Sequence, residues 1–339
     1  MNNICVYCEI DGGIVSDVSL ELISKAVKLA AELKCEVEAV AIGSDLKNIE
    51  DQISPYGAHI IHISDDKRLY PYTTLPHSAI FEHILKEQKP QIVLVGATSV
   101  GRDLAPRIAS SLRCGLTADC TDLVIGEYFD PKTGKEYKNL LYQIRPAFGG
   151  NIIATIVNPE TKPQMATVRE GVMKKEGADK NFKSRINTVN PSKILDKVDF
   201  AVKIIERHIE ARKVNLSGTQ VIVSGGFGVG SKEGFSLLYE LARVIGGEVG
   251  ASRAAVDAGF AEHARQVGQT GVTVRPKLYI ACGISGAIQH RAGMDGSAQI
   301  ISINTDPEAP INSIADVAIT GDLHSVIPKM IKYYKEQSK

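Results

Sequence analysis

The stretch from Lys277 to Asp306 contains residue types that can bind a phosphate-bearing ligand. Its apolar run 278–282 predicts a buried strand, and glycine and serine interrupt the pattern at 283–286. Glycine accepts a positive φ and lets a ligand approach the main chain. A strand that passes through small residues into a helical turn directs unpaired N–H groups and the positive end of a helix dipole at one point. Such a point suits a phosphate.

A second predicted strand, 299–303, ends near Asn304 and Asp306, whose polar side chains suit a ribose or a base edge. Both would lie at the carboxyl edge of a parallel sheet, where α/β proteins bind nucleotides. One glycine-rich turn is weak evidence by itself. The same residues therefore also fit an ordinary strand–helix turn without a ligand.

Two further glycine-rich turns follow predicted strands. The turn at 96–103, GATSVGRD, could hold a phosphate, but its charged residues could equally fix the turn or contact a partner chain. The turn at 225–231, GGFGVGS, matches neither the dinucleotide fingerprint nor the Walker loop. It remains a turn of main-chain amides before a helix predicted at 232–245, which suits one pyrophosphate.

Four strings in the C-terminal half form one ordered series: VGASRAAVDAG at 249–259, QVGQTG at 266–271, GISGAIQHRAGM at 283–294 and INTDPEAPI at 303–311. This series resembles the C-terminal domain of the electron transfer flavoprotein alpha subunit. The resemblance implies an FAD cofactor. It also implies that the N-terminal domain resembles a nucleotide-binding fold, of the adenine-nucleotide-hydrolase type, that carries no flavin of its own.

The resemblance assigns a role to each matching residue. It implies that Arg253 lies against the flavin and the pyrophosphate, that the Thr270 hydroxyl lies near flavin N5, and that His290 faces flavin O2. Where the family commonly has arginine, this chain has Phe227, so one cation beside the cofactor is missing. The residues implied to bind FAD are Gly226, Phe227, Ser252, Arg253, Val267, Gly268, Gln269, Thr270, Ser285, Gly286, Ala287, Ile288, Gln289, His290, Asn304, Asp322 and Leu323.

FAD itself carries the redox chemistry, and the protein supplies orientation and electrostatics. A guanidinium and an imidazole near the ring would favour the negative charge of a reduced flavin, and a hydroxyl at N5 would tune the same step. Such a site needs no nucleophile or general base. We therefore predict neither catalytic residues nor metal ligands.

The elements that must position these residues alternate between strand and helix. This alternation predicts parallel sheets with helices on both faces, and so two α/β domains, the second a doubly wound FAD-binding domain. A hairpin, 123–128 with 140–144, interrupts the alternation in the first half. The other elements expected there are strands at 4–10, 37–42, 59–63, 91–95, 152–157 and 165–170 and helices at 17–33 and 74–87.

The charged and polar stretch 174–192 is typical of a solvated, mobile connection. We therefore predict an N-terminal α/β domain at 1–192 that contacts a partner subunit. A linker and the C-terminal FAD-binding domain follow at 193–339. Within that domain the segment 249–271 is expected to be a long functional loop, and a helix from Leu323 to about 334 is expected to end the fold.

The composition excludes several functions. The 339 residues carry equal numbers of acidic and basic side chains, 39 of each, so nothing favours nucleic acid or an anionic membrane. No apolar run approaches the ~20 residues of a membrane span, and the N-terminus lacks a signal-peptide pattern, so we expect a cytoplasmic protein. Cys5 and Cys8 have CxxC spacing, but on a strand they point to opposite faces, which argues against a metal or redox pair.

The resemblance implies an electron carrier rather than a substrate-converting enzyme. It would form a heterodimer with an electron transfer flavoprotein beta subunit. It would accept electrons from flavin dehydrogenases, such as the acyl-CoA dehydrogenases of fatty acid oxidation, and pass them to another carrier. Two alternatives remain: an electron-bifurcating member of the family that uses NADH and a second flavin, and a nucleotide-binding regulatory module without electron transfer.

Overall fold

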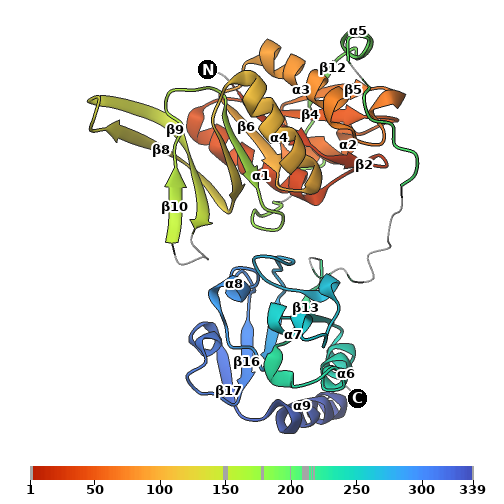
Figure 1. Ribbon diagram of the computed structural model, residues 1–339, viewed down its shortest axis with the longest axis vertical. Coiled ribbons are helices and arrows are strands. Elements are labelled where there is room, and N and C mark those ends of the chain that lie inside the picture. Colours follow the sequence, from red (N-terminus) through yellow and green to blue (C-terminus); the bar gives the residue numbers. More distant parts are fainter. Residues whose placement is uncertain are drawn as a thin grey trace. The chain divides into compact units, whose positions relative to one another are not determined.

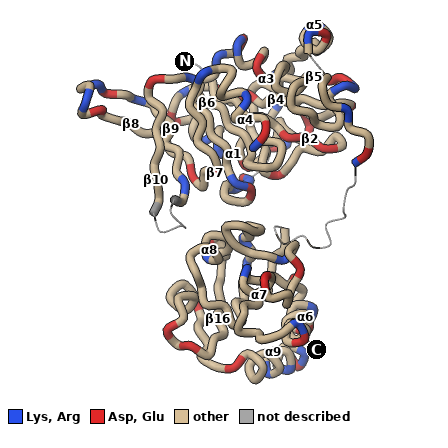
Figure 2. The backbone as a smooth tube through the Cα atoms, viewed as in Figure 1, with Lys and Arg blue, Asp and Glu red and all other residues tan. Residues whose placement is uncertain are grey.

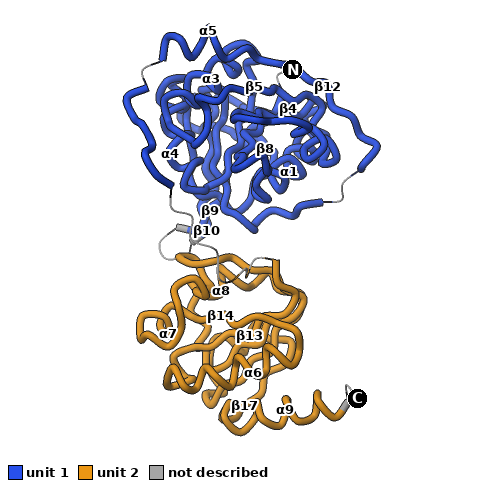
Figure 3. Tube along the Cα trace, turned by 90° about the vertical axis from the view of Figure 1, so that its right-hand side faces the viewer, with its two compact units in different colours: residues 1–147, 153–207 blue, residues 148–152, 208–339 orange. Residues whose placement is uncertain are grey.

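The computed structural model describes residues 3–147, 152–176, 179–198, 200–207, 214, 216 and 218–337. Contacts divide the chain into two compact units, shown in Figure 3. The N-terminal unit comprises Met1–Ala147 and Ile153–Arg207, and the C-terminal unit comprises Phe148–Ile152 and His208–Lys339. The N-terminal unit thus continues past the predicted boundary at 192. Lys and Arg are interspersed with Asp and Glu along both units (Figure 2).

A sheet of seven strands forms the centre of the N-terminal unit (Figure 1). The strands are β1 (Ile4–Cys8), β4 (Val37–Gly43), β5 (Ile60–Asp65), β6 (Ile92–Gly96), β7 (Leu116–Cys120), β11 (Gln164–Val168) and β12 (Arg185–Thr188). They pair in parallel in the order β12-β5-β4-β1-β6-β11-β7. The parallel sheet predicted from the strand–helix alternation is therefore confirmed.

Helices cover both faces of this sheet, so its central strands β1, β4 and β6 are buried along their whole length. Cys8 packs with α1 in the core on one face, and Cys5 packs with α3 and α4 in the core on the other, as the strand geometry predicts. All six cysteines are free thiols. The helices are α1 (Asp17–Leu33), α2 (Glu50–Ile53), α3 (Thr74–Gln88), α4 (Ser99–Leu112) and α5 (Ser192–Leu195).

Two small antiparallel features complete the N-terminal unit. The predicted hairpin is present as β8 (Asp122–Asp130) and β9 (Lys135–Ala147), and it projects from the rest of the unit (Figure 1). Strand β10 (Ile152–Ile156) lies next to β9 and makes a three-stranded sheet. Strands β2 (Ile10–Asp11) and β3 (Ile14–Val15) form a short hairpin after β1.

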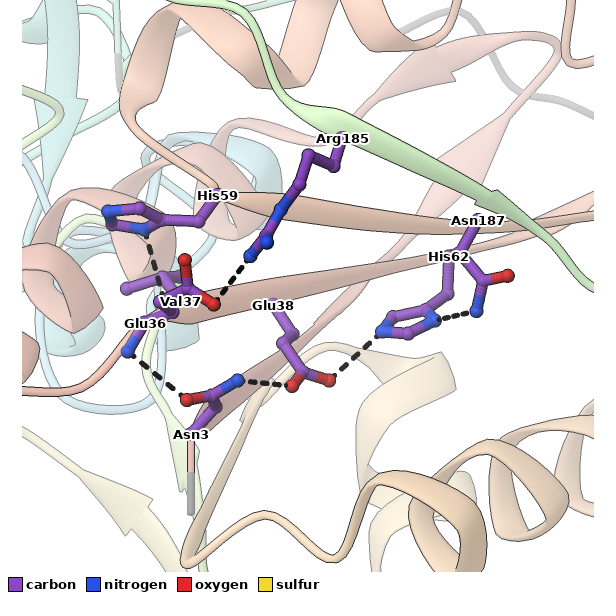
Figure 4. A network of polar contacts seen from close by, with 8 residues as sticks. All are labelled: Asn3, Glu36, Val37, Glu38, His59, His62, Arg185 and Asn187. Carbon is purple, nitrogen blue, oxygen red and sulfur yellow. Dashed lines mark hydrogen bonds and ion pairs between the residues drawn. The ribbon is translucent and has the colours of Figure 1, made fainter. Parts of the chain in front are cut away.

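The polar stretch predicted as a solvated connection instead contains the edge strand β12, which pairs with β5. A polar network that begins on β12 crosses the sheet (Figure 4). Asn187 Nδ2 donates to His62 Nδ1 over 2.9 Å, and His62 Nε2 lies 2.9 Å from the buried carboxylate of Glu38. Asn3 also donates to Glu38, over 2.6 Å. The four residues of β12 are themselves exposed, and the strand is held by its pairing with β5, by the Asn187–His62 contact and by an ion pair between Arg185 and Glu36.

The C-terminal unit contains a second parallel sheet. Helices α6 and α9 pack together on one face, and segments between 267 and 311 cover the other. Its helices are α6 (Phe235–Ile245), α7 (Arg253–Asp257), α8 (Ile288–Arg291) and α9 (Leu323–Gln337). Its strands are β13 (Val221–Gly225), β14 (Glu248–Ala251), β15 (Leu278–Cys282), β16 (Ile300–Asn304) and β17 (Val317–Thr320), in the order β14-β13-β15-β16-β17.

A candidate cofactor pocket in the C-terminal unit

A cavity of about 650 Å³ lies where the C-terminal unit's strands end. The turns after β13, β14, β15 and β16 all contribute lining residues. Since the strand order reverses direction between β13 and β15, the cavity lies at the topological switch point, which is where doubly wound sheets bind nucleotides.

The cavity extends across the sheet. Arg253 follows β14 and Asn304 ends β16, and three steps between neighbouring strands separate these two strands. At about 4.8 Å per step, the lining residues span roughly 14 Å. This width suits an elongated ligand such as a dinucleotide.

Close contact between two glycine turns forms the floor of the cavity. Gly226 N donates to the Cys282 carbonyl over 2.8 Å, and Gly228 N donates to the Gly283 carbonyl over 3.0 Å. A Cβ at Gly226 would lie 2.0 Å from the Gly283 oxygen, so only glycine fits there. The Gly226 amide is therefore used within the chain, and Gly226 itself does not line the cavity.

The turn after β15 also requires glycine. Gly283 has φ +61° and Gly286 has φ +88°, both in the left-handed region. A Cβ at Gly286 would come within 2.3 Å of the Ile311 amide nitrogen. That amide donates to the Ser285 carbonyl over 3.0 Å, so the turn is packed directly against the segment after β16.

The loop 266–270 forms one wall. Val267 N donates to the Ala251 carbonyl over 2.8 Å, and Gln269 N donates to the Gln289 carbonyl over 2.7 Å. The buried Gln266 side chain donates to the Thr270 hydroxyl over 2.9 Å. The loop is therefore tied to β14 at one end and to α8 at the other.

His290 is a buried residue of the wall, and both of its ring nitrogens have partners within the chain. Nδ1 lies 3.1 Å from the Val267 carbonyl, and Nε2 lies 3.0 Å from the Tyr279 hydroxyl. Burial lowers the pKa of His290 to about 4, although the Val267 carbonyl opposes the shift. The ring is therefore neutral at pH 7, and in this arrangement its nitrogens are engaged with the protein rather than with the cavity.

Helix α7 supplies two charged side chains to the lining of the cavity. Arg253 and Asp257 lie one turn apart on this helix and form an ion pair of 3.4 Å. Both are largely exposed, with 68% and 65% of the side chain accessible. Ser252 is buried at the start of α7 and accepts a hydrogen bond from Ala255 N over 3.4 Å. Helix α7 lies within the segment that the sequence predicted as a loop.

At the end of β16, Asn304 holds the turns after β15 and β16 in position. Its Nδ2 donates to the Ile284 carbonyl over 2.9 Å, and its Oδ1 accepts from Asp306 N over 3.0 Å. Asp322 instead caps α9 by accepting from His324 N over 3.0 Å, and Leu323 is buried in the core.

The structure brings most of the predicted site residues together around the cavity. Those that line it are Phe227, Ser252, Arg253, Val267, Gly268, Gln269, Thr270, Ser285, Gly286, Ala287, Gln289, His290 and Asn304. The predicted residues outside this lining are Gly226, Ile288, Asp322 and Leu323. The lining residues that were not predicted as FAD contacts are Gly228, Ala254, Asp257, Gln266, Gly283, Ile284, Asp306, Ala309 and Pro310.

A sequence signal existed for some of these additional residues. Asp257 lies four positions after Arg253, a spacing that pairs side chains on a helix. Gln266 is the first residue of the string QVGQTG at 266–271, whose next four residues were predicted to bind FAD. Ala309 and Pro310 belong to the string INTDPEAPI at 303–311, and they lie next to Ile311, which packs against the turn after β15.

The lining residues fit FAD by their chemistry. Phe227, Val267, Ile284 and Ala309 supply apolar surface for a large ring system, and Phe227 stacks on Phe260 with 5.7 Å between the ring centres. The guanidinium of Arg253 and the exposed Ser285 and Thr270 supply groups that suit an anionic, hydroxylated chain.

The polar groups of the glycine turn at 96–103 form hydrogen bonds within the N-terminal unit. The Thr98 hydroxyl accepts from Gly101 N over 3.0 Å and bonds to the Glu9 carboxylate. Asp103 accepts from the hydroxyls of Tyr72 and Thr74, over 2.7 and 2.6 Å. These contacts favour the alternative in which side chains fix this turn over the one in which it holds a phosphate.

Neither a metal-binding cluster nor a membrane-spanning helix occurs among the described residues. No group of three or more His, Cys, Asp or Glu side chains there could hold a metal ion. Nor does any helix in the described parts of the chain combine the length and the hydropathy that crossing a membrane requires.

Comparison with known proteins adds the family. Residues 4–194 match the electron transfer flavoprotein domain, and residues 215–295 match the electron transfer flavoprotein FAD-binding domain. These matches confirm FAD as the cofactor of the C-terminal unit.

Relatives match nearly the whole chain. An electron transfer flavoprotein subunit alpha from Thermoanaerobacterium thermosaccharolyticum is 47% identical, covering 98% of both chains. The acryloyl-CoA reductase electron transfer subunit beta of Anaerotignum propionicum is 40% identical, covering 98% of this chain and 96% of its own. The subunit LctC of a lactate dehydrogenase (NAD(+),ferredoxin) from Acetobacterium woodii is 38% identical, covering 97% and 76%. The chain therefore belongs to the family of electron transfer flavoprotein alpha subunits.

Proposed function

We propose that this chain is an electron carrier, the FAD-binding half of a heterodimer with an electron transfer flavoprotein beta subunit. In this proposal it receives electrons from a flavin dehydrogenase, such as an acyl-CoA dehydrogenase, and passes them to a downstream carrier. FAD, when bound, supplies the redox chemistry. The chain's own residues bind it, orient it and set the charge around it.

The observation that supports this most is the composition of the cavity lining. Among the described residues that line it, the ionisable side chains are Arg253, Asp257, His290 and Asp306. His290 is neutral and engaged at both nitrogens, and Arg253 and Asp257 are paired with each other. This set can bind and tune a cofactor, but it offers no activated nucleophile to a substrate.

We assign three groups of residues to parts of the cofactor. Arg253 would lie against both the flavin and the pyrophosphate, and the turn 285–287 would hold the pyrophosphate, because a guanidinium and main-chain amides suit anionic oxygens. The loop 266–270 would lie along the flavin and exclude water from one side of it. Asn304 and Asp306 would hold the adenosine end. Asp322 and Leu323, outside the lining, remain weaker candidates for that end.

The contact with the beta subunit is assigned to the N-terminal unit. The three-stranded sheet β8–β10 exposes large apolar side chains, with 59% of Phe129 and 73% of Ile153 accessible. Apolar side chains on an exposed sheet are typical of a protein interface. Expressed alone, the chain should aggregate or lose FAD. A stable, FAD-loaded monomer would contradict the heterodimer.

The central experiment is purification together with the beta subunit. We expect a flavin absorption spectrum with at least one FAD per heterodimer, bleached when an acyl-CoA dehydrogenase and its acyl-CoA are added. A heterodimer that holds FAD but accepts electrons from no flavin dehydrogenase would contradict the carrier function. That result would favour the regulatory, nucleotide-binding alternative.

The second candidate function is electron bifurcation with NADH. The relatives named for acryloyl-CoA reductase and for a lactate dehydrogenase that uses NAD(+) and ferredoxin favour it. Two FAD per heterodimer and direct reduction by NADH would support bifurcation. One FAD and no reduction by NADH would support the simple carrier.

A further inference from the structure

A chain of three buried groups runs through the wall of the cavity: the Tyr279 phenol, the His290 imidazole and the Val267 carbonyl. Tyr279 belongs to β15, His290 to α8 and Val267 to the loop 266–270, so the three groups connect separate elements. Tyr279 is 0% exposed and His290 is 6% exposed. The family resemblance implies a role at the flavin for His290 and none for Tyr279.

The partners determine which nitrogen of His290 carries the proton. A carbonyl oxygen can only accept, so Nδ1, 3.1 Å from the Val267 carbonyl, must be protonated. In the neutral ring Nε2 is then an acceptor, and it accepts from the Tyr279 hydroxyl at 3.0 Å. Burial raises the pKa of Tyr279, so the phenol keeps the proton that it donates.

His290 in turn holds the loop. The bond from Nδ1 reaches Val267, and the neighbouring bond from Gln269 N reaches the Gln289 carbonyl over 2.7 Å. These two bonds tie the loop 266–270 to two consecutive residues of α8, His290 and Gln289. The first depends on the orientation of the imidazole ring, which the Tyr279 hydroxyl fixes from the other side.

We propose that Tyr279 is a positioning residue of the FAD pocket: its phenol holds His290 in the Nδ1–H tautomer and in one orientation, and His290 thereby holds the loop 266–270 in place for the cofactor. This inference rests on the proposed function only in placing FAD against that loop. A loop that is ordered before binding costs less entropy when the ligand binds.

The N-terminal unit contains the same pair of groups away from the cavity, and it supplies a matched control. The Tyr7 hydroxyl lies 3.0 Å from His77 Nδ1, and His77 Nε2 lies 2.9 Å from the Leu69 carbonyl. Tyr7 is 2% exposed and His77 is 4% exposed. Replacing either tyrosine by phenylalanine removes one buried phenol–imidazole bond, but only one of the two lies at the cavity.

The test compares Tyr279→Phe with Tyr7→Phe in the FAD-loaded heterodimer. Histidine labelled with ¹⁵N reports the tautomer and the pKa of each imidazole. Among the described residues, burial and the Val267 carbonyl shift the pKa of His290, and no charged side chain contributes to the shift. Losing a donor to its neutral form should therefore raise the pKa of His290 by about half a unit to one unit. The FAD dissociation constant should rise about threefold to tenfold.

The control variant should show its effect in the N-terminal unit and not at the cavity. Tyr7→Phe should change the titration of His77 and leave the FAD dissociation constant unchanged. Equal weakening of FAD binding by both variants would overturn the proposal, because it would indicate general destabilisation. A Tyr279→Phe variant with wild-type FAD binding would overturn it as well.

The wild-type protein alone provides a further test, which stands even if Tyr279→Phe does not fold. Its His290 must show a protonated Nδ1 and an unprotonated Nε2, and the opposite tautomer would overturn the proposal. Failure of the proposed function would look different, because the wild-type heterodimer would then hold FAD without accepting electrons from any dehydrogenase.

Discussion

Arg207 and Asp11, which lie 196 positions apart in the chain, are joined by two parallel hydrogen bonds of 2.7 Å each. Arg207 also donates to the Tyr70 hydroxyl over 2.8 Å, and its guanidinium lies 5.8 Å from the centre of the Tyr70 ring. The bonds from Arg207 lower the pKa of the Asp11 carboxyl. Arg207 ends the N-terminal unit, so this contact anchors the segment 200–207 on that unit.

We predict that Arg207→Ala makes this segment easier to cleave. Its apolar side chains are already exposed, with 65% of Val202 and 94% of Ile205 accessible. Loss of an exposed ion pair worth up to ~1 kcal/mol should raise the rate of thermolysin cleavage within 200–207 about two- to fivefold. Mass spectrometry of the fragments measures this rate.

Lys28→Ala is the matched control for Arg207→Ala. It removes another exposed ion pair of the N-terminal unit, between Lys28 and Glu176 at 2.7 Å, that does not contact the segment 200–207. Equal cleavage rates in the two variants would show that Arg207 does not anchor the segment.

The sequence predicted the elements whose signal is local. The strands β1, β4 and β6 are continuous apolar runs because helices bury both of their faces, and such runs can be recognised without knowing the partners. The turn after β15 was predicted because its backbone needs positive φ angles at 283 and 286, and the glycines that allow them can be read from the sequence. The strings that resemble the flavoprotein family then predicted most of the lining.

What the sequence did not predict depends on partners distant in the chain. Strand β12 is polar and exposed, and it is a strand because β5 pairs with it and because Asn187 reaches the buried His62. Helix α7 has five residues, too few for an apolar period. The engagement of both His290 nitrogens could not be predicted either, since Tyr279 and Val267 lie 11 and 23 positions away.

Two glycines of the C-terminal unit should respond differently to substitution by alanine. Gly286 and Gly230 have nearly the same φ, +88° and +86°. A Cβ at Gly286 would lie 2.3 Å from the Ile311 nitrogen, whereas a Cβ at Gly230 meets nothing within 4 Å. Both variants incur backbone strain of ~1–2 kcal/mol, but only Gly286→Ala must also displace Ile311, which follows the lining residues Ala309 and Pro310.

We therefore expect Gly286→Ala to be purified with little or no FAD and Gly230→Ala to retain it. The ratio of flavin absorbance to protein measures the occupancy. Full occupancy in Gly286→Ala would show that the packing of this turn against Ile311 is not needed for cofactor binding.

The stability of the C-terminal unit should fall in mild acid because of His290. Its pKa is about 4 in the folded protein and ~6.5 when unfolded, so the unfolded chain binds more protons below pH 6.5. The stabilisation that comes from the neutral, buried ring is complete above pH 6.5 and is lost as the pH falls toward 4. At ~1.4 kcal/mol per unit, this loss is roughly 2 kcal/mol at pH 5.

Urea unfolding at pH 7 and pH 5 measures this dependence. We expect His290→Gln to be less stable than the wild type at pH 7 but to lose less stability between the two pH values. The exposed His324 provides the control, and His324→Gln should keep the wild-type pH dependence. An unchanged pH dependence in His290→Gln would remove His290 as its cause.

The ion pair between Arg253 and Asp257 gives the sharpest test of the electrostatics around the cofactor. The two side chains lie 3.4 Å apart, and both line the cavity. If the flavin binds there as proposed, the guanidinium favours the negative charge that reduction adds and the carboxylate opposes it. The two substitutions should therefore shift the potential of the first one-electron step in opposite directions.

Arg253→Ala should lower this potential and Asp257→Asn should raise it, each by roughly 40 mV. That value corresponds to ~1 kcal/mol for a partly exposed charge, with ~59 mV for each tenfold change in equilibrium constant. A reductive titration of the holoprotein, with the FAD content measured, gives the potential. Lys332→Ala should leave it unchanged, because Lys332 pairs with Glu336 on α9 in the same one-turn spacing, and neither lines the cavity. Loss of FAD from Arg253→Ala with an unchanged potential in the remaining holoprotein would instead assign Arg253 to phosphate binding alone or to the fold. Shifts of the same sign in both variants would exclude a direct effect of these charges on the flavin.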